Sequence, residues 1–234
     1  MNEIAQQNLL KKTDQIWRGV SDVWFTAQTV FEGVYRWGRF EQIGMRSQDD
    51  LQHSYSVTVL AMIFLEKISP YHTELDQKLV LQSFLVHDHG EGELKRDFCI
   101  NVKKPIHDVE EYIAFCKRYS QLESSVFSAL EKAYLLQHAG LKDNSIFPEN
   151  TQNILNYLLQ NKYYESLCFK AIEVWDYLLY ALEQNRNIPD LIILPEVARN
   201  QIPVMDYLAQ KLPGFKEEIW TPEISHLFHE VKLK

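Results

Sequence analysis

The chain is short of the residues that build disulfide frameworks, tight turns and membrane spans. Its 234 residues include three cysteines, an odd number without a CxxC pair, which argues against a disulfide framework or a cysteine-rich zinc site. Eight glycines and eight prolines are few for this length, and sparse helix breakers favour an all-α protein. No apolar run approaches the roughly 20 residues of a membrane span, and the N-terminal residues do not resemble a signal peptide. We therefore expect a cytoplasmic protein.

Positive charge is also scarce. The chain has 24 Lys and Arg against 32 Asp and Glu, a formal net charge of -8. This balance argues against nucleic acid or an anionic membrane surface as the main partner, although it permits a small basic pocket for a phosphate. Hydrophobic residues make up 46% of the chain, enough for a substantial core. Because no repeat or linker divides the sequence, we expect a single domain over residues 1–234.

Apolar residues recur at helical spacing along most of the chain. One or two helices are expected before residue 33, followed by loop and short helix over 34–51, with Asp49 or Asp50 near an N-cap. Five prolines are expected to divide the C-terminal part into shorter helices: Pro189, Pro195, Pro203, Pro213 and Pro222. The other predicted helices cover about 51–69, 74–88, 107–139, 149–161 and 167–187, with Gly90 placed to end the second of them.

The stretch Phe84–Glu91 predicts the end of a buried helix that carries His87 and Asp88 into the interior. A buried carboxylate beside an imidazole needs a compensating partner, and a divalent cation is a strong candidate. His53 is expected in the first turn of one helix, and Asp176 lies between apolar neighbours in another. Two histidines and two carboxylates suit Mn²⁺, Co²⁺, Zn²⁺ or Mg²⁺. A histidine in a first helical turn is more often a surface or capping residue, so the residues alone leave both interpretations open.

Three segments together resemble the H…HD…D signature of HD-domain metal-dependent phosphohydrolases. They are Arg46–Ser54, Leu85–Glu91 and Glu173–Asp176, and the closest similarity is to the 5′-deoxynucleotidase-like branch. The resemblance covers about residues 34–186. It implies an HD-domain helical bundle around a single metal site, with extra C-terminal helices over about 190–234.

The resemblance also implies roles for individual residues. The divalent metal ion would be held by His53, His87, Asp88 and Asp176. Glu91 would position or deprotonate the attacking water, and Asp97 would assist at the leaving oxygen or the water. Contacts to the substrate are expected from Arg39, Phe40, Arg46 and Lys103.

The sequence departs from the family pattern at three places. Gln52 stands where the family usually has glutamate before the first histidine. The family's Arg-Trp pair, which packs against the sugar, is matched best by spacing at Arg39-Phe40 and by identity at Arg36-Trp37, further back in the chain. The segment from Glu91 to Asp97 is one residue longer than usual.

The resemblance implies hydrolysis of the phosphate monoester of a nucleoside 5′-monophosphate, often a deoxy form. The partner would then be a small-molecule nucleotide or phosphate ester, and family members are commonly homodimers. Two alternatives stay open: an HD phosphodiesterase or alarmone pyrophosphohydrolase, and a non-catalytic HD module that binds a nucleotide or a protein. His107 or His138 joining a second ion is a further, less favoured alternative.

Overall fold

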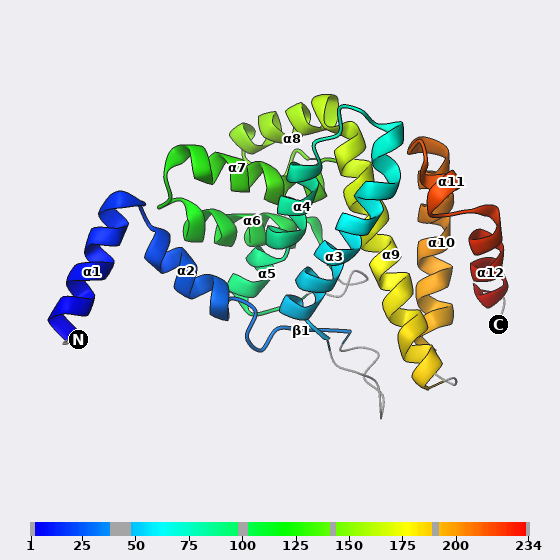
Figure 1. The fold of residues 1–234 in the computed structure, drawn as a ribbon, viewed down its shortest axis with the longest axis horizontal. Helices are drawn as coiled ribbons and strands as arrows, with labels where there is room; N and C mark the ends of the chain where they lie inside the picture. Colours follow the sequence, from blue (N-terminus) through cyan, green and yellow to red (C-terminus); the bar gives the residue numbers. More distant parts are fainter. Residues whose placement is uncertain (1–2, 38–47, 98–102, 141–143, 189–191, 233–234) are drawn as a thin grey trace.

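The protein is described by a computed structural model that covers residues 3–37, 48–97, 103–140, 144–188 and 192–232. This described part is almost entirely helical, which confirms the predicted all-α class (Figure 1). None of its helices combines the length and apolar character that a membrane crossing requires. The helices are α1 (Glu3–Ile16), α2 (Val20–Thr29), α3 (Asp50–Ile68), η2 (Ser69–Tyr71), α4 (Gln77–Val86), α5 (His89–Leu94), α6 (Pro105–Tyr119), α7 (Ser124–Leu135), η3 (Leu136–His138), α8 (Glu149–Asn161), α9 (Tyr163–Asn187), α10 (Ile193–Lys211), α11 (Phe215–Glu218) and α12 (Pro222–Lys232).

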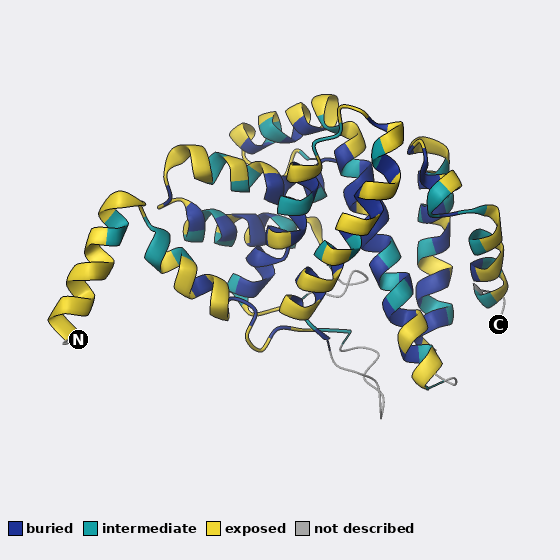
Figure 2. Cartoon of the chain, viewed as in Figure 1, coloured by how far each residue is buried: buried dark blue, intermediate teal, exposed yellow. Residues whose placement is uncertain are grey.

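The centre of the fold is formed by α3, α4 and α9. Each of these helices packs against the other two, while α7 covers α4 and α10 runs along α9. Figure 2 shows their dark blue, buried faces turned toward one another and their yellow faces turned outward. The periodic apolar residues that predicted these helices are therefore the ones that form the core, among them Val57, Phe64 and Leu65 of α3 and Ile172, Val174 and Leu178 of α9.

Two short antiparallel strands lead into α3. The strands are β1 (Tyr35–Arg36) and β2 (Gln48–Asp49), with Arg36 opposite Gln48. Asp49 is the N-cap of α3, as predicted, because its carboxylate accepts the Gln52 N–H at 2.7 Å. The cap fixes the first turn of α3, and with it the position of the histidine at residue 53.

The chain turns sharply where α4 gives way to α5. The helix predicted over 74–88 is shorter, because α4 ends at Val86 and α5 begins at His89. Gly90 lies inside α5 and does not end a helix, so that interpretation is wrong. A Cβ atom on Gly90 would lie 2.5 Å from the Glu111 carbonyl oxygen and 2.6 Å from the Tyr134 hydroxyl. Glycine is required here by the close approach of α5 and α6.

Two further helix predictions are corrected. The long helix expected over 107–139 is divided into α6 and α7, because Leu122 turns inward to a buried position and Glu123 is extended. The C-terminal prolines divide the chain less than expected. Pro203 lies inside the 19-residue helix α10. One missing backbone hydrogen bond is tolerated there, because the helix is held along α9 by its buried apolar face.

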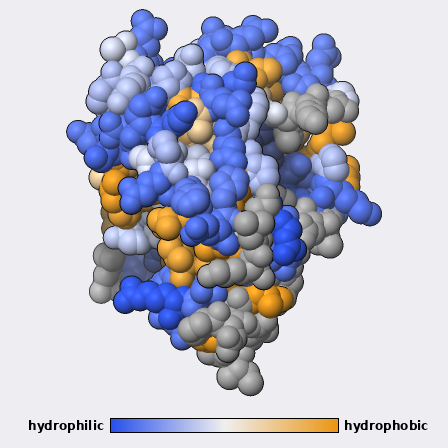
Figure 3. Space-filling model, turned by 90° about the vertical axis from the view of Figure 1, so that its right-hand side faces the viewer, coloured by the Kyte–Doolittle hydropathy of each residue, from blue (hydrophilic) through white to orange (hydrophobic). Residues whose placement is uncertain are grey.

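The C-terminal helices complete the core beside α9. Trp175 of α9 packs edge-on against Trp220 and Phe228, with ring centroids 5.9 and 5.7 Å apart. The surface on this side is mostly hydrophilic, with separate apolar patches (Figure 3). The predicted boundary between a motif-bearing core and a C-terminal extension stays a prediction.

Candidate metal centre

Three side chains from two helix ends meet in the interior. The Nε2 atoms of His53 and His87 lie 3.3 Å apart. The Oδ2 atom of Asp88 lies 3.2 Å from Nε2 of His87 and 3.8 Å from Nε2 of His53. Bonds of about 2.0–2.2 Å to a divalent ion place neighbouring ligand atoms roughly 3.0–3.6 Å apart. The separations from His87 lie in this range and that between His53 and Asp88 is slightly longer, so these three buried groups could hold such an ion.

Each imidazole ring is oriented by an oxygen atom that contacts its Nδ1 atom. The Nδ1 atom of His87 lies 3.1 Å from the Phe84 carbonyl oxygen, and Nδ1 of His53 lies 3.0 Å from Oδ2 of Asp176. Histidines that bind metals usually donate their second ring N–H to an oxygen in this way, which leaves the other nitrogen as the ligand. The two Nε2 atoms thus face the centre with their orientation fixed.

Helix α9 contributes two carboxylates with different placements. Asp176 contacts His53 on the side of the ring that faces away from Asp88, so its role as a direct ligand stays a prediction. Glu173, one turn earlier, brings Oε1 to 3.3 Å from Nε2 of His53 and 3.2 Å from Nε2 of His87. This oxygen is buried and forms ion-pair contacts with both rings. A carboxylate oxygen this close to both ring nitrogens is placed to join them around a shared cation.

Glu173 was not among the predicted site residues. The available signal was its position three residues before Asp176, since residues three apart lie on one face of a helix. Within the described residues, the group able to share an ion is His53, His87 and Asp88, and neither His107 nor His138 forms a second one.

The Arg-Trp dipeptide at residues 36 and 37 lies at the centre. Arg36 donates from Nη1 to Oδ2 of Asp88 at 2.8 Å and from Nη2 to the Tyr177 hydroxyl at 3.3 Å. Trp37 stacks on Tyr180 with ring centroids 4.7 Å apart. The match by identity thus lies beside the candidate ligands, whereas the match by spacing, Arg39-Phe40, falls outside the described residues. Three of the expected substrate residues lie outside the described residues: Arg39, Phe40 and Arg46.

Glu91 and Lys103 form a second charged group beside the first. The Nζ atom of Lys103 lies 2.8 Å from Oε1 of Glu91 and 2.8 Å from Oε2 of Glu111, and 3.4 Å from Asp108. Lys103 therefore neutralises carboxylates, including the one expected to act on water. Asp97 is partly buried, and its carboxyl pKa is raised by burial although Arg36 opposes the shift.

The charges of the centre depend on one another. Burial and Arg36 lower the pKa of His53, but its hydrogen bonds to Asp176 and Glu173 prevail and raise it to about 10. Burial would raise the pKa of Glu173, yet the contacts with His53 and His87 hold it well below its usual range. A divalent cation bound among these carboxylates would compete with the proton on His53, because both are stabilised by the same negative charges.

Two other groups have shifted pKa values. Burial, followed by the charge of Asp88, raises the pKa of Glu91 well above its ordinary value, against the opposing effect of Lys103. Burial and Asp88 also raise the pKa of Asp50 to about 8. Oδ1 of Asp50 lies 3.8 Å from Nη1 of Arg36.

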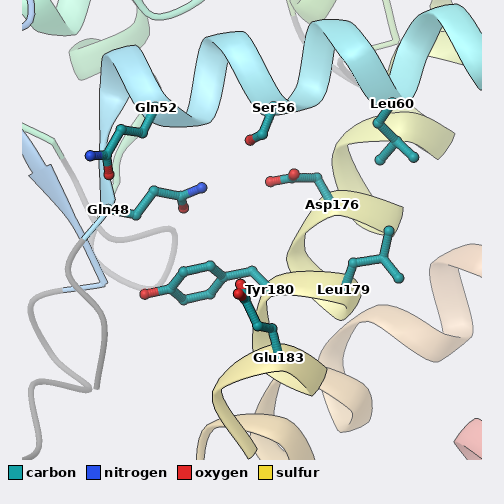
Figure 4. Close-up of a pocket in the computed structure, with 8 residues that line it drawn as sticks. All are labelled: Gln48, Gln52, Ser56, Leu60, Asp176, Leu179, Tyr180 and Glu183. Atoms are coloured by element: carbon teal, nitrogen blue, oxygen red, sulfur yellow. The ribbon is translucent and has the colours of Figure 1, made fainter. Parts of the chain in front are cut away.

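A cavity of about 250 Å³ lies between α3 and α9, on the Asp176 side of His53 (Figure 4). In Figure 4 the carboxylate of Asp176 and the amide of Gln48 face each other across this space. The lining residues are Gln48, Gln52, Ser56, Leu60, Asp176, Leu179, Tyr180 and Glu183.

Comparison with known proteins agrees with this geometry. Residues 34–190 match the model of a family described as HD domain. No curated protein and no solved structure matches the chain. The matched residues make up more than half of the 234-residue chain and contain the ligand cluster of His53, His87 and Asp88. The chain therefore belongs to the HD domain family.

Proposed function

We propose that the protein is a metal-dependent phosphohydrolase that removes the 5′-phosphate of a (deoxy)nucleoside monophosphate or a related small phosphate ester. The observation that carries this proposal is the convergence of two imidazole Nε2 atoms and the Asp88 carboxylate at ligand spacing. HD domains are generally hydrolases, and the deoxynucleotidase branch is the one that the sequence resembles most.

Four residues would hold the ion in this proposal: His53, His87, Asp88 and Glu173. Asp176 would fix the ring of His53, and its direct coordination, expected from the family pattern, is the competing assignment. A divalent ion at this position supplies Lewis acidity toward a phosphoryl oxygen and lowers the pKa of water.

Glu91 would hold the attacking water and accept its proton. Its carboxylate follows Asp88 by three residues and is buried beside the ligand cluster. A general base works best when its pKa lies near the working pH, and burial shifts the pKa of Glu91 upward in that direction. Lys103 would keep part of the population ionised. Asp97 would assist at the leaving oxygen.

Substrate recognition would begin at Arg36 and Trp37. The guanidinium of Arg36 is suited to two phosphate oxygens, and the Trp37 ring offers an apolar face for the sugar. Arg39, Phe40 and Arg46 remain predicted substrate contacts. Lys103 is proposed to act through Glu91, and its predicted contact with phosphate remains to be tested.

The test is a phosphate-release screen of the purified protein with Mn²⁺ or Co²⁺. The panel contains ribo- and deoxynucleoside monophosphates, cyclic nucleotides and pyrophosphorylated nucleotides. Asp88→Asn should abolish release, while Glu66→Gln, an exposed change on α3, should leave it unchanged. Full activity of Asp88→Asn would contradict the proposal. Release only from cyclic or pyrophosphorylated nucleotides would support the alternative enzyme classes, and metal binding without turnover would support a binding module.

A further inference from the structure

Asp50 is a buried carboxylate to which the proposed mechanism gives no role. Its relative exposure is 0%, and among the described residues neither of its oxygens has a hydrogen-bond partner. It is the first residue of α3, but the capping bond is already supplied by Asp49. The start of the helix therefore does not require a carboxylate at residue 50.

Such a group is costly without a partner. Buried polar atoms are almost always hydrogen-bonded, and a buried charge needs a countercharge. An apolar side chain of similar size would fill the same space without that cost. A carboxylate at this position points to an interaction that forms in another state of the protein.

Among the described residues, the guanidinium of Arg36 forms an ion pair with Asp50 and stands between two carboxylates. Its Nη1 atom lies 2.8 Å from Oδ2 of Asp88 and 3.8 Å from Oδ1 of Asp50. Its Nη2 atom donates to the Tyr177 hydroxyl at 3.3 Å. One guanidinium nitrogen thus faces both carboxylates and lies nearer to Asp88 than to Asp50.

The Asp88 oxygen that accepts from Arg36 is also the oxygen that faces the two imidazole Nε2 atoms. Arg36 and a divalent ion would therefore use the same atom. Two cations at one carboxylate oxygen repel each other, so binding of the ion weakens the bond between Arg36 and Asp88.

We propose that Asp50 is a positioning residue that receives the guanidinium of Arg36 when a divalent cation binds Asp88. The inference rests on the proposed metal centre. Asp50 then keeps Arg36 at the centre, where a phosphate can reach it, and lowers the cost of displacing it from Asp88. Metal affinity should consequently depend on Asp50 only as long as Arg36 is present.

The experiment is a double-mutant cycle in Mn²⁺ affinity, measured by calorimetry on the full chain. Asp50→Asn should weaken Mn²⁺ binding about tenfold in the presence of Arg36 and less than twofold in an Arg36→Met background. Asp50→Val provides a second variant with the same expectation. Asp49→Ser removes a neighbouring charge while keeping an N-cap oxygen, and should change the affinity less than twofold.

The outcomes separate this inference from the metal centre itself. Equal losses in both backgrounds would overturn the role of Asp50, because they would show a general effect of its charge. Unchanged affinity with altered urea stability would overturn it as well, since that is the result of a merely structural role. Wild-type protein that binds no Mn²⁺ would overturn the metal centre, and the inference with it.

Discussion

The Oε1 atom of Glu173 lies 3.2 Å from the Nε2 atom of His87, inside the ring of candidate metal ligands. One turn later on the same helix, Asp176 reaches the opposite edge of His53. Helix α9 thus directs one carboxylate to the centre and one to the back of a ligand ring. Substitutions of Glu173 and Asp176 should therefore have different effects on metal affinity.

Glu173→Gln should lower Mn²⁺ affinity by roughly 100-fold or more, because it removes a charged ligand. Asp176→Asn should lower it by about tenfold, the usual effect of losing the group that orients a ligand histidine. Calorimetric titration of both variants measures the difference. A larger loss in Asp176→Asn would reverse the roles and support Asp176 as the direct ligand.

Gly90→Ala should destabilise the protein by about 1–3 kcal/mol, because the new methyl group has no space between α5 and α6. Gly140→Ala is the matched control. Its Cβ would meet no heavy atom of the described residues within 4 Å, so the free energy of unfolding should change by less than about 0.5 kcal/mol. Urea unfolding measures both. Equal stability of the two variants would contradict the close contact seen at Gly90.

His138 should make the protein sensitive to acid. Burial, followed by the charge of Lys103, lowers the pKa of His138 to about 3, below the value of about 6.5 in an unfolded chain. Between these two pKa values the unfolded state binds a proton that the folded state does not. With respect to His138, the protein therefore keeps its full stability above pH 6.5 and loses stability as the pH falls toward 3.

Between about pH 7.5 and pH 5, His138 is expected to lower the free energy of unfolding by about 2 kcal/mol. The His138→Gln variant should lack this pH dependence. The His226→Gln variant, an exposed change on α12, should keep it. Urea unfolding at both pH values gives the difference. The same pH dependence in wild type and His138→Gln would show that His138 titrates normally.

Lys103→Met should leave Glu91 and Glu111 without their shared cation. The expected cost is about 2–3 kcal/mol, less than for a fully buried pair because the Lys103 side chain is 21% exposed. Lys104→Met, an exposed neighbour, should be nearly neutral. Thermal unfolding tests this difference. Weaker nucleotide binding at unchanged stability would instead support the phosphate contact predicted for Lys103.

Much of the fold follows from local sequence signals. Helical periodicity predicted α3, α8 and α9 to within a few residues, because apolar spacing and capping act over single turns. For the same reason Asp49 or Asp50 was expected near an N-cap, and Asp49 is the cap. The predicted ligand set was His53, His87, Asp88 and Asp176, since their spacing matches a known pattern, and the structure brings the first three together.

Other features depended on contacts between distant segments. Gly90 is required by the approach of α6, and Pro203 is tolerated because α10 lies along α9. The residues near Gly90 and Pro203 in the sequence do not reveal that α6 and α9 lie beside them. Packing between helices sets how closely these segments approach.

The sequence by itself indicated that imidazoles and carboxylates of α3, of the junction between α4 and α5, and of α9 could meet. It did not determine which of them face the centre. Glu173 and Asp176 are separated by less than one turn, so the rotation of α9 against α3 selects between them. In the same way, the path of the chain before α3 brings Arg36 to Asp88. Tertiary packing decides which side chains face the centre, because a few tens of degrees of helix rotation move a side chain from one edge of a ring to the other.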